Sequence, residues 1–484
     1  MKKKFELPKF SKEIIILLVI LLCALFLRTY KSIEGYGYGH DADLYSWIVK
    51  DIVVDGHIRL IGQETSTSGI YIGPLYYYML IPFYLLTNMD PIGVIGFAAA
   101  LGLLTVFSYY WVFKKLFDPT TGLIAAFVQT FLEIRIGYDR WIVPTILVNI
   151  WAIWYLFVVF NLSRGNFSVF FILGILVGLI WHINLALVPI LLLVPVAIFF
   201  SKKLPSVKNV ILGFAGFIIP SVPLILFEIK HGFTQTSAFI NSFLLKQENV
   251  YGASKFDDVI KQAFGNNLLI PVIILLSGIF LVTRKKLSAK NLILLYLWVI
   301  SIVAFFTFSS KLISEYYFEN IKTVLLCLGI LALSFLFKLN YKTKIIAILI
   351  MIFISYMGIK FVFSLTGSTD GYLERKAAVE YIYQDAKSHN YPCIAISYIT
   401  WPGYDLGYRY FFWLKNMKVN RPDLDRPIYT IVSPASLAGD DVKIQFKMVG
   451  VIPPRIAVAS RERMEYSCSG QNSNLTDPFF GFNN

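Results

Sequence analysis

Long apolar segments, separated by short loops rich in lysine and arginine, constrain this chain more than any other feature. A helix needs roughly 20 apolar residues to cross the hydrocarbon core of a bilayer. The chain is 57% hydrophobic and 15% charged, whereas soluble domains carry about 25% charged residues. We therefore predict a polytopic α-helical membrane protein with about 11 transmembrane helices. The predicted spans are 13–28, 92–113, 121–135, 143–161, 167–182, 185–200, 208–227, 266–282, 290–308, 321–338 and 344–365.

The basic residues predict the orientation, because cytoplasmic loops are enriched in lysine and arginine. With an odd number of spans, all the basic clusters fall on one side: 2–4, 114–115, 164, 202–203, 284–286 and 338–344. We expect an uncleaved N-terminal anchor, since no small-residue cleavage site follows the first apolar run. The net charge of +14 is explained by these loops, and no nucleic-acid partner is expected.

The same orientation divides the chain into a transmembrane domain, 1–365, and an extracytoplasmic domain, 366–484. The first outer loop, 29–91, contains the apolar stretch 73–89, which would invert every later loop if it spanned. We interpret it as a helix in the outer interface, where tyrosines are common. Residues 366–484 alternate short apolar runs with turn residues ("YPCIAISYI", "RPIYTIVS", "PPRIAVAS"), which predicts a small α/β domain.

The C-terminal region also holds two of the four cysteines, Cys393 and Cys468. A disulfide between them fits an extracytoplasmic domain. Two free thiols fit the sequence equally well, so both possibilities stay open.

Carboxylates cluster just beyond the first apolar run, in "YGHDADLYSWIVKDIVVDG". As a helix over 41–54, this stretch places Asp51 on the apolar face and Asp41 at its start. Asp43 points elsewhere, beside Lys50, as a solvated acid. Asp41 is either an N-cap or faces a polar cavity, where an ionisable group usually has a function.

This stretch and "GIYIGPLYYYMLIPFYLL" resemble the first outer loop of GT-C membrane glycosyltransferases, in the group of protein O-mannosyltransferases and aminoarabinose transferases. "YDRWIVP" (138–144), "LILFEIKHGFTQT" (224–236) and "SEYYFENIK" (314–322) resemble later outer turns of that group. "AAVEYIYQDA" and "YRYFFWLKNMKVNRPD" are similar to the periplasmic tail of bacterial members. Many relatives have Asp-Glu or Asp-Gln at the catalytic turn, but here Ala42 follows Asp41, so a role for Asp43 stays open.

The resemblance implies a GT-C-like fold and an inverting transfer of a sugar from a polyprenyl-phosphate carrier to a glycan, lipid or protein acceptor. Asp41 is the predicted base, and whether Asp43 shares this catalytic role stays open. Cations are expected to bind the donor phosphate: Arg140, Lys230, His231 and Lys311. We further predict that five residues line the substrate cavity: Tyr45, Asp51, Tyr76, Asp139 and Tyr316. The expected location is the bacterial inner membrane, with a cytoplasmic N-terminus.

His40 and His57 match no metal-binding spacing. No metal or other cofactor is expected, although relatives differ over a divalent cation. Two other classes of protein compete with the transferase. A transporter or flippase would show internal repeats and charges within its spans, and the sequence has no convincing repeat. A membrane scaffold would use the C-terminal domain to bind a partner.

Overall fold

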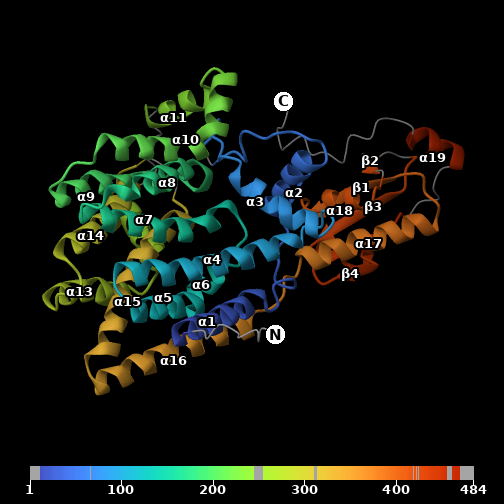
Figure 1. The fold of residues 1–484 in the computed structure, drawn as a ribbon. Coiled ribbons are helices and arrows are strands. Elements are labelled where there is room, and N and C mark those ends of the chain that lie inside the picture. Colours follow the sequence, from blue (N-terminus) through green and yellow to red (C-terminus); the bar gives the residue numbers. More distant parts are fainter. Residues whose placement is uncertain are drawn as a thin grey trace, which may run out of the picture. The chain divides into compact units, whose positions relative to one another are not determined.

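The computed structural model describes residues 11–65, 67–244, 254–309, 313–417, 419–420, 422, 425–454 and 460–468 (Figure 1). The chain divides into two compact units. The bundle unit comprises Met1–Arg28, Arg59–Tyr76 and Ala98–Phe363, and the sheet unit comprises Thr29–Ile58, Tyr77–Phe97 and Ser364–Asn484. Segments from the first outer loop therefore belong to the same unit as the C-terminal domain.

Among the described residues of the bundle unit, regular secondary structure is helical, apart from an isolated antiparallel β-bridge between Glu64 and Tyr71. Its elements, some of which begin or end in the other unit, are α1 (Lys12–Thr29), α4 (Gly93–Leu116), α5 (Pro119–Phe131), α6 (Glu133–Tyr138), η1 (Pro144–Leu147), α7 (Val148–Ser163), η2 (Phe167–Val169), α8 (Phe170–Ile183), η3 (Leu185–Leu192), α9 (Leu193–Ser201), α10 (Val207–Lys230), α11 (Thr234–Leu244), α12 (Ser254–Phe264), α13 (Leu269–Thr283), α14 (Ala289–Phe308), η4 (Glu315–Phe318), α15 (Glu319–Leu339) and α16 (Tyr341–Ser364).

Among the described residues, six helices are long and apolar enough to cross a membrane. They are Gly93–Leu116, Pro144–Ser163, Val207–Lys230, Ala289–Phe308, Glu315–Leu339 and Tyr341–Ser364. A seventh candidate is the pair α12 and α13, which is bent by 75°. The polytopic α-helical prediction is therefore confirmed, and the other expected spans coincide with shorter or interrupted helices.

The predicted span 121–135 illustrates such an interruption. Leu132 ends α5 with an extended backbone (φ −70°, ψ 118°), and α6 starts at the next residue. Each of the two helices is too short to cross a bilayer. The stretch predicted to lie in the interface, 73–89, contains α3 (Leu75–Leu86), which at 12 residues is also shorter than a span.

Glycines allow α8 and α10 to pack closely within the bundle. A Cβ atom added at Gly174 would lie 1.9 Å from the carbonyl oxygen of Gly213, and one at Gly216 would lie 2.3 Å from that of Phe171. In a bilayer the hydrophobic effect does not drive helices together, so small residues that let backbones approach are the usual basis of helix pairing. This contact is typical of a membrane bundle.

The sheet unit carries a five-stranded sheet in the order β2-β1-β3-β5-β4. Its strands are β1 (Ile394–Thr400), β2 (Val419–Asn420), β3 (Ile428–Ser433), β4 (Ile444–Phe446) and β5 (Val449–Ile452). β1 is parallel to both β2 and β3, whereas β5 is antiparallel to β3 and β4. Its other elements are α2 (His40–Val53), α3, α17 (Tyr372–Ser388), α18 (Arg409–Leu414), η5 (Ala435–Leu437), η6 (Gly439–Asp441) and α19 (Arg461–Cys468).

The expected small α/β domain is confirmed, and β1 and β3 fall in the first two predicted strands. Most of the third, "PPRIAVAS", lies outside the described residues. Cys393 and Cys468 form a disulfide, with Cα atoms 5.8 Å apart. The guanidinium of Arg426 also donates to the carbonyl of Ser467, so α19 is attached to the sheet in two ways.

Candidate active site

Asp41 is an exposed carboxylate on a helix that is otherwise largely buried. Residues 42–49 of α2 are all buried, whereas the Asp41 side chain is 54% exposed. Asp41 is not the N-cap: Gly39 holds that position, without a side-chain cap. Asp41 instead lies in the first helical turn, where the amide dipoles favour a negative charge, and His40 contacts it at 3.4 Å.

Buried hydroxyl groups fix the helix that carries Asp41. Ser46 donates to the carbonyl of Ala42 at 2.6 Å and accepts from Tyr38 at 3.0 Å. Its oxygen also lies 2.7 Å from the hydroxyl of Tyr84 on α3. Tyr36, which precedes α2, bonds to the hydroxyl of Tyr45. These contacts attach the first two turns of α2 to residues on both sides of it in sequence.

Aromatic rings from the C-terminal part of the chain complete the packing of α2. The ring of Trp47 lies edge-on to Tyr410, with centroids 5.3 Å apart, and 6.3 Å from Trp413. Tyr38 packs against Phe411 at 4.9 Å. The helix therefore has little freedom to rotate, and Asp41 remains on its exposed side.

Asp43 differs from the sequence prediction of a solvated acid beside Lys50. It is only 2% exposed, and the hydroxyl of Tyr38 lies 3.5 Å from one of its oxygens. Lys50 pairs instead with Asp55 at 2.6 Å. Burial raises the pKa of Tyr38 well above its ordinary value, and the charge of Asp43 adds to this shift. The Tyr38 hydroxyl therefore stays protonated, which lets it donate to Asp43 or Ser46.

Two histidines lie near acids of α2. The Nδ1 atom of His57 lies 2.7 Å from a carboxylate oxygen of Asp51, and His40 lies beside Asp41. Across the part of the chain that the structure describes, no group of three or more His, Cys, Asp and Glu residues could hold a metal ion. The expectation of no cofactor stays a prediction.

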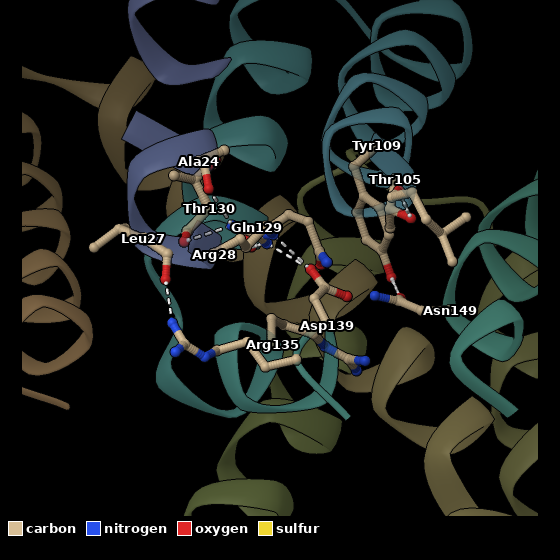
Figure 2. A network of polar contacts seen from close by, with 12 residues as sticks. Ala24, Leu27, Arg28, Thr105, Tyr109, Gln129, Thr130, Arg135, Asp139 and Asn149 are labelled. Carbon is tan, nitrogen blue, oxygen red and sulfur yellow. Dashed lines mark hydrogen bonds and ion pairs between the residues drawn. The ribbon is translucent and has the colours of Figure 1, made fainter. Parts of the chain in front are cut away.

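A buried ion pair anchors α1 inside the bundle unit (Figure 2). Arg28 binds Asp139 at 2.6 Å and donates to the carbonyl of Gln129 at 3.0 Å. Gly102 makes room for this arginine, because a Cβ atom there would lie 2.6 Å from its side chain. Asp139, one of the predicted cavity residues, is only 4% exposed and binds α1 in this structure.

A cavity of about 600 Å³ lies in the bundle unit beside the outer turns predicted from sequence. Tyr316, a predicted lining residue, contributes to it, together with Trp141 and Lys322. Lys322 pairs with Glu319, which also binds the buried Arg135 at 2.8 Å. Neither Lys322 nor Glu319 was among the site residues predicted from the sequence. Their spacing of three residues at the start of a predicted helix is the signal that could have found them.

The remaining predicted site residues lie in varied settings. Arg140 is half-buried and donates to the carbonyl of Leu27 at 3.1 Å. Lys230 is exposed at the last residue of α10, and His231 stacks on Phe227 with centroids 4.2 Å apart. Tyr45 and Tyr76 are buried. Lys311 lies outside the described residues.

Comparison with solved structures identifies the fold. The chain is similar to ArnT from Cupriavidus metallidurans bound to undecaprenyl phosphate, with a TM-score of 0.60 and 13% identity over 92% of this chain and 98% of that one. The apo state of the same protein gives a TM-score of 0.59 and 11% identity over 95% and 99%. An oligosaccharyltransferase from Archaeoglobus fulgidus is similar with a TM-score of 0.49 and 14% identity over 83% and 61%.

The sequence matches no protein-family model, and no curated protein is significantly similar to it. The likeness to ArnT, a GT-C aminoarabinose transferase, covers 92% of this chain. The GT-C-like fold expected from the sequence is thus confirmed. The long apolar helices and this fold are those of an integral membrane protein.

Proposed function

We propose that this chain is a membrane glycosyltransferase that moves a sugar from a polyprenyl-phosphate donor to an acceptor at the outer face of the membrane. The observation that carries the proposal is the likeness to ArnT over 92% of the chain. One of those two ArnT structures contains undecaprenyl phosphate, which supports a lipid phosphate as the carrier here. The acceptor is a glycan, a lipid or a protein.

Asp41 acts as the general base in this proposal. An acceptor hydroxyl gives its proton to the Asp41 carboxylate as its oxygen attacks the anomeric carbon of the sugar. The bond from that carbon to the phosphate oxygen breaks on the opposite face, so the configuration inverts. Positive charge develops near the sugar ring in the transition state, and a nearby carboxylate stabilises it. The exposed position of Asp41 on a rigid helix supports this role.

The leaving group is the lipid phosphate, which gains one negative charge when the bond breaks. Arginine and lysine stabilise such groups through charge-assisted hydrogen bonds. Arg140, Lys230, His231 and Lys311 are the residues we assign to this task, and Lys322 beside the cavity of about 600 Å³ joins them. No metal is required by this scheme.

We further propose that the protein resides in the bacterial inner membrane, with its N-terminus in the cytoplasm and its sheet unit outside. The disulfide between Cys393 and Cys468 supports an oxidising location for the sheet unit. Impermeant labelling of single cysteines placed in the basic loops and in the sheet unit measures this orientation.

The decisive experiment follows a sugar label through the purified protein in nanodiscs. Polyprenyl-phosphate donors carrying different labelled sugars are incubated with membrane extracts that supply acceptors. A labelled covalent product, with release of the polyprenyl phosphate, is the expected result. If the protein instead moves the labelled lipid across proteoliposomes and forms no covalent product, it is a flippase and the proposal is wrong.

A further inference from the structure

A polar cavity of about 500 Å³ lies along α12 in the bundle unit, at residues that the proposed reaction does not use. Its polar lining comes from Lys255, Asp258, Lys261, Gln262 and Asn266. Four of these five side chains belong to one short helix, α12, and Asn266 follows two residues after its end. This grouping of two ammonium groups, one carboxylate and two amides makes the cavity a candidate for a small charged group.

The helix α12 presents these side chains on one face. Spacings of three, six and seven residues from Lys255 bring Asp258, Lys261 and Gln262 to the same side. Val259 and Ala263 are buried elsewhere on the helix. Lys255 itself is only 5% exposed, and its ammonium group donates to the carbonyl of Ser309. One of the two cations is therefore held in a fixed position, whereas Lys261 is exposed.

In the topology predicted from the sequence, the position of α12 in the chain places the cavity at the membrane surface. The apolar helix α13 follows it after a bend of 75°, made possible by Gly265, whose φ of +81° is accessible to glycine. An amphipathic helix that turns away from a neighbouring span lies in the headgroup layer. The far end of α13 leads to the basic loop 284–286, so α12 lies on the opposite, outer side in the predicted topology.

The charge of the lining matches one negative charge on the ligand. Among the described residues of the lining, two ammonium groups and one carboxylate leave a net charge of +1. A phosphodiester carries a single negative charge, which this lining neutralises. A phosphate monoester carries close to two negative charges at pH 7, because its second pKa is about 6. Asp258 would repel the second charge.

An apolar space adjoins the polar one. Gln262 lines both this cavity and the cavity of about 600 Å³, whose apolar lining includes Trp141, Tyr316 and Phe361. A ligand with a charged head could therefore place its head between Lys255 and Lys261 and its hydrocarbon against these rings. That combination is the chemistry of a membrane lipid.

We propose that the polar cavity on α12 binds the phosphodiester group of a lipid in preference to a phosphate monoester. A phospholipid and a glycosylated polyprenyl phosphate both contain this group, and either one fits the lining. The inference goes beyond sugar transfer, since it concerns binding and holds whether or not the protein is an enzyme.

The test measures lipid binding by native mass spectrometry of the full chain, without any transfer reaction. The probes are phosphatidylglycerol, glucosyl undecaprenyl phosphate, undecaprenyl phosphate and diacylglycerol, with inorganic phosphate as a soluble competitor. We expect the two diesters to bind more tightly than the monoester, and diacylglycerol to bind least. The relative affinity of the two diesters shows whether the site prefers a phospholipid or a glycosylated polyprenyl phosphate.

Variants connect the binding to the cavity. Lys255→Gln with Lys261→Gln should weaken diester binding about tenfold or more, which is a loss of about 1.4 kcal/mol or more in binding free energy, because it removes both ammonium groups of the lining. Lys208→Gln, at an exposed lysine of α10, should leave it unchanged. A double variant in which α12 unfolds would also lose binding, so the second test uses a substitution that should strengthen the binding of one ligand. Asp258→Asn should strengthen monoester binding relative to the diesters, whereas the neighbouring Asp257→Asn should not.

Four results would overturn the inference. One is a double lysine variant that binds phosphatidylglycerol as the wild type does. Another is a wild-type protein that prefers the monoester to both diesters. The third is an Asp258→Asn variant that leaves the preference between diester and monoester unchanged. Competition by inorganic phosphate at the same concentration as the lipids would also exclude a lipid site.

Discussion

Asp139 in the bundle unit and Asp41 in the sheet unit are both carboxylates of predicted outer turns, yet the two units treat them differently. Asp139 is 4% exposed and binds Arg28 at 2.6 Å, whereas Asp41 is 54% exposed and contacts His40 at 3.4 Å. A buried carboxylate held by a guanidinium is occupied by its structural role. An exposed carboxylate on a fixed helix is available to a ligand.

Loose packing of α2 is not the reason that Asp41 is exposed. Its residues 42–49 are buried, and Ser46 alone connects Tyr38, Tyr84 and the backbone of Ala42. The packing of the sheet unit thus buries most of α2 and leaves the Asp41 side chain exposed. The comparison predicts that changes at Asp41 affect function and that changes at the Arg28–Asp139 pair affect stability.

Asp41→Asn is the substitution with the largest expected effect. The amide cannot accept the acceptor's proton, so sugar transfer should fall about 10³-fold, within the range of general-base catalysis. The melting temperature should stay within about 1 °C of the wild type, because the side chain is exposed and isosteric. Transfer of labelled sugar and thermal unfolding of the same preparation provide the two measurements.

Asp55→Asn is the matched control for Asp41→Asn. Asp55 also lies near α2 and is partly exposed, but it pairs with Lys50, and we expect full transfer activity from this variant. Full activity in Asp41→Asn would contradict its assignment as the base. Loss of folding in that variant would contradict the view that the packing of α2 is independent of Asp41.

Arg28→Met is expected to have the next largest effect, on stability. It removes the partner of a buried carboxylate, and breaking a buried ion pair in this way costs about 3–5 kcal/mol. The free energy of unfolding in detergent should fall by that amount. Exchanging both residues, as Arg28→Met with Asp139→Leu, should recover much of the loss, since no uncompensated charge remains. A double variant as unstable as the single one would show that the backbone contacts of Arg28 dominate.

The place of Asp41 on its helix could be predicted from the sequence, whereas the burial of Asp139 in an ion pair with Arg28 could not. The periodicity of 41–54 predicted α2 to within one residue at each end and placed Asp41 at its start. The burial of Asp43 was not predicted. It depends on Tyr38, which lies outside the helix, and on tertiary packing that local periodicity does not encode. Similarly, composition predicted the span 121–135, whereas the extended backbone of Leu132 divides it into two helices.

The charged groups of the bundle show the same limit. Arg135, Glu319 and Lys322 meet although 184 residues separate the first two, and no single-sequence pattern pairs them. The disulfide illustrates the reverse case: the sequence left pairing and free thiols equally open, and only the spatial arrangement of Cys393 and Cys468 decides it.

Removing the disulfide tests how the sheet unit keeps its helices in place. The bond closes a loop of 75 residues around β1 to α19, and native disulfides stabilise by about 2–4 kcal/mol. Cys393→Ser with Cys468→Ser should lower the stability of the sheet unit by that amount, measured by proteolysis of the C-terminal region. Cleavage within the bundle unit is the internal control and should not change. Equal sensitivity in both units would mean that they unfold together.

Asp55→Asn has the smallest expected effect. It tests whether the distance between the charges or their burial determines how much an ion pair stabilises the fold. The Lys50–Asp55 pair has the same 2.6 Å separation as Arg28–Asp139, but the Asp55 side chain is 35% exposed. Water competes for both charges at the surface, so such pairs contribute about 0.2–1 kcal/mol. We expect Asp55→Asn to lower the free energy of unfolding by less than about 1 kcal/mol, and added salt to reduce even this difference. A loss as large as that of Arg28→Met would show that proximity outweighs burial, and the contrast between the two units would then no longer explain why one carboxylate is structural and the other is available.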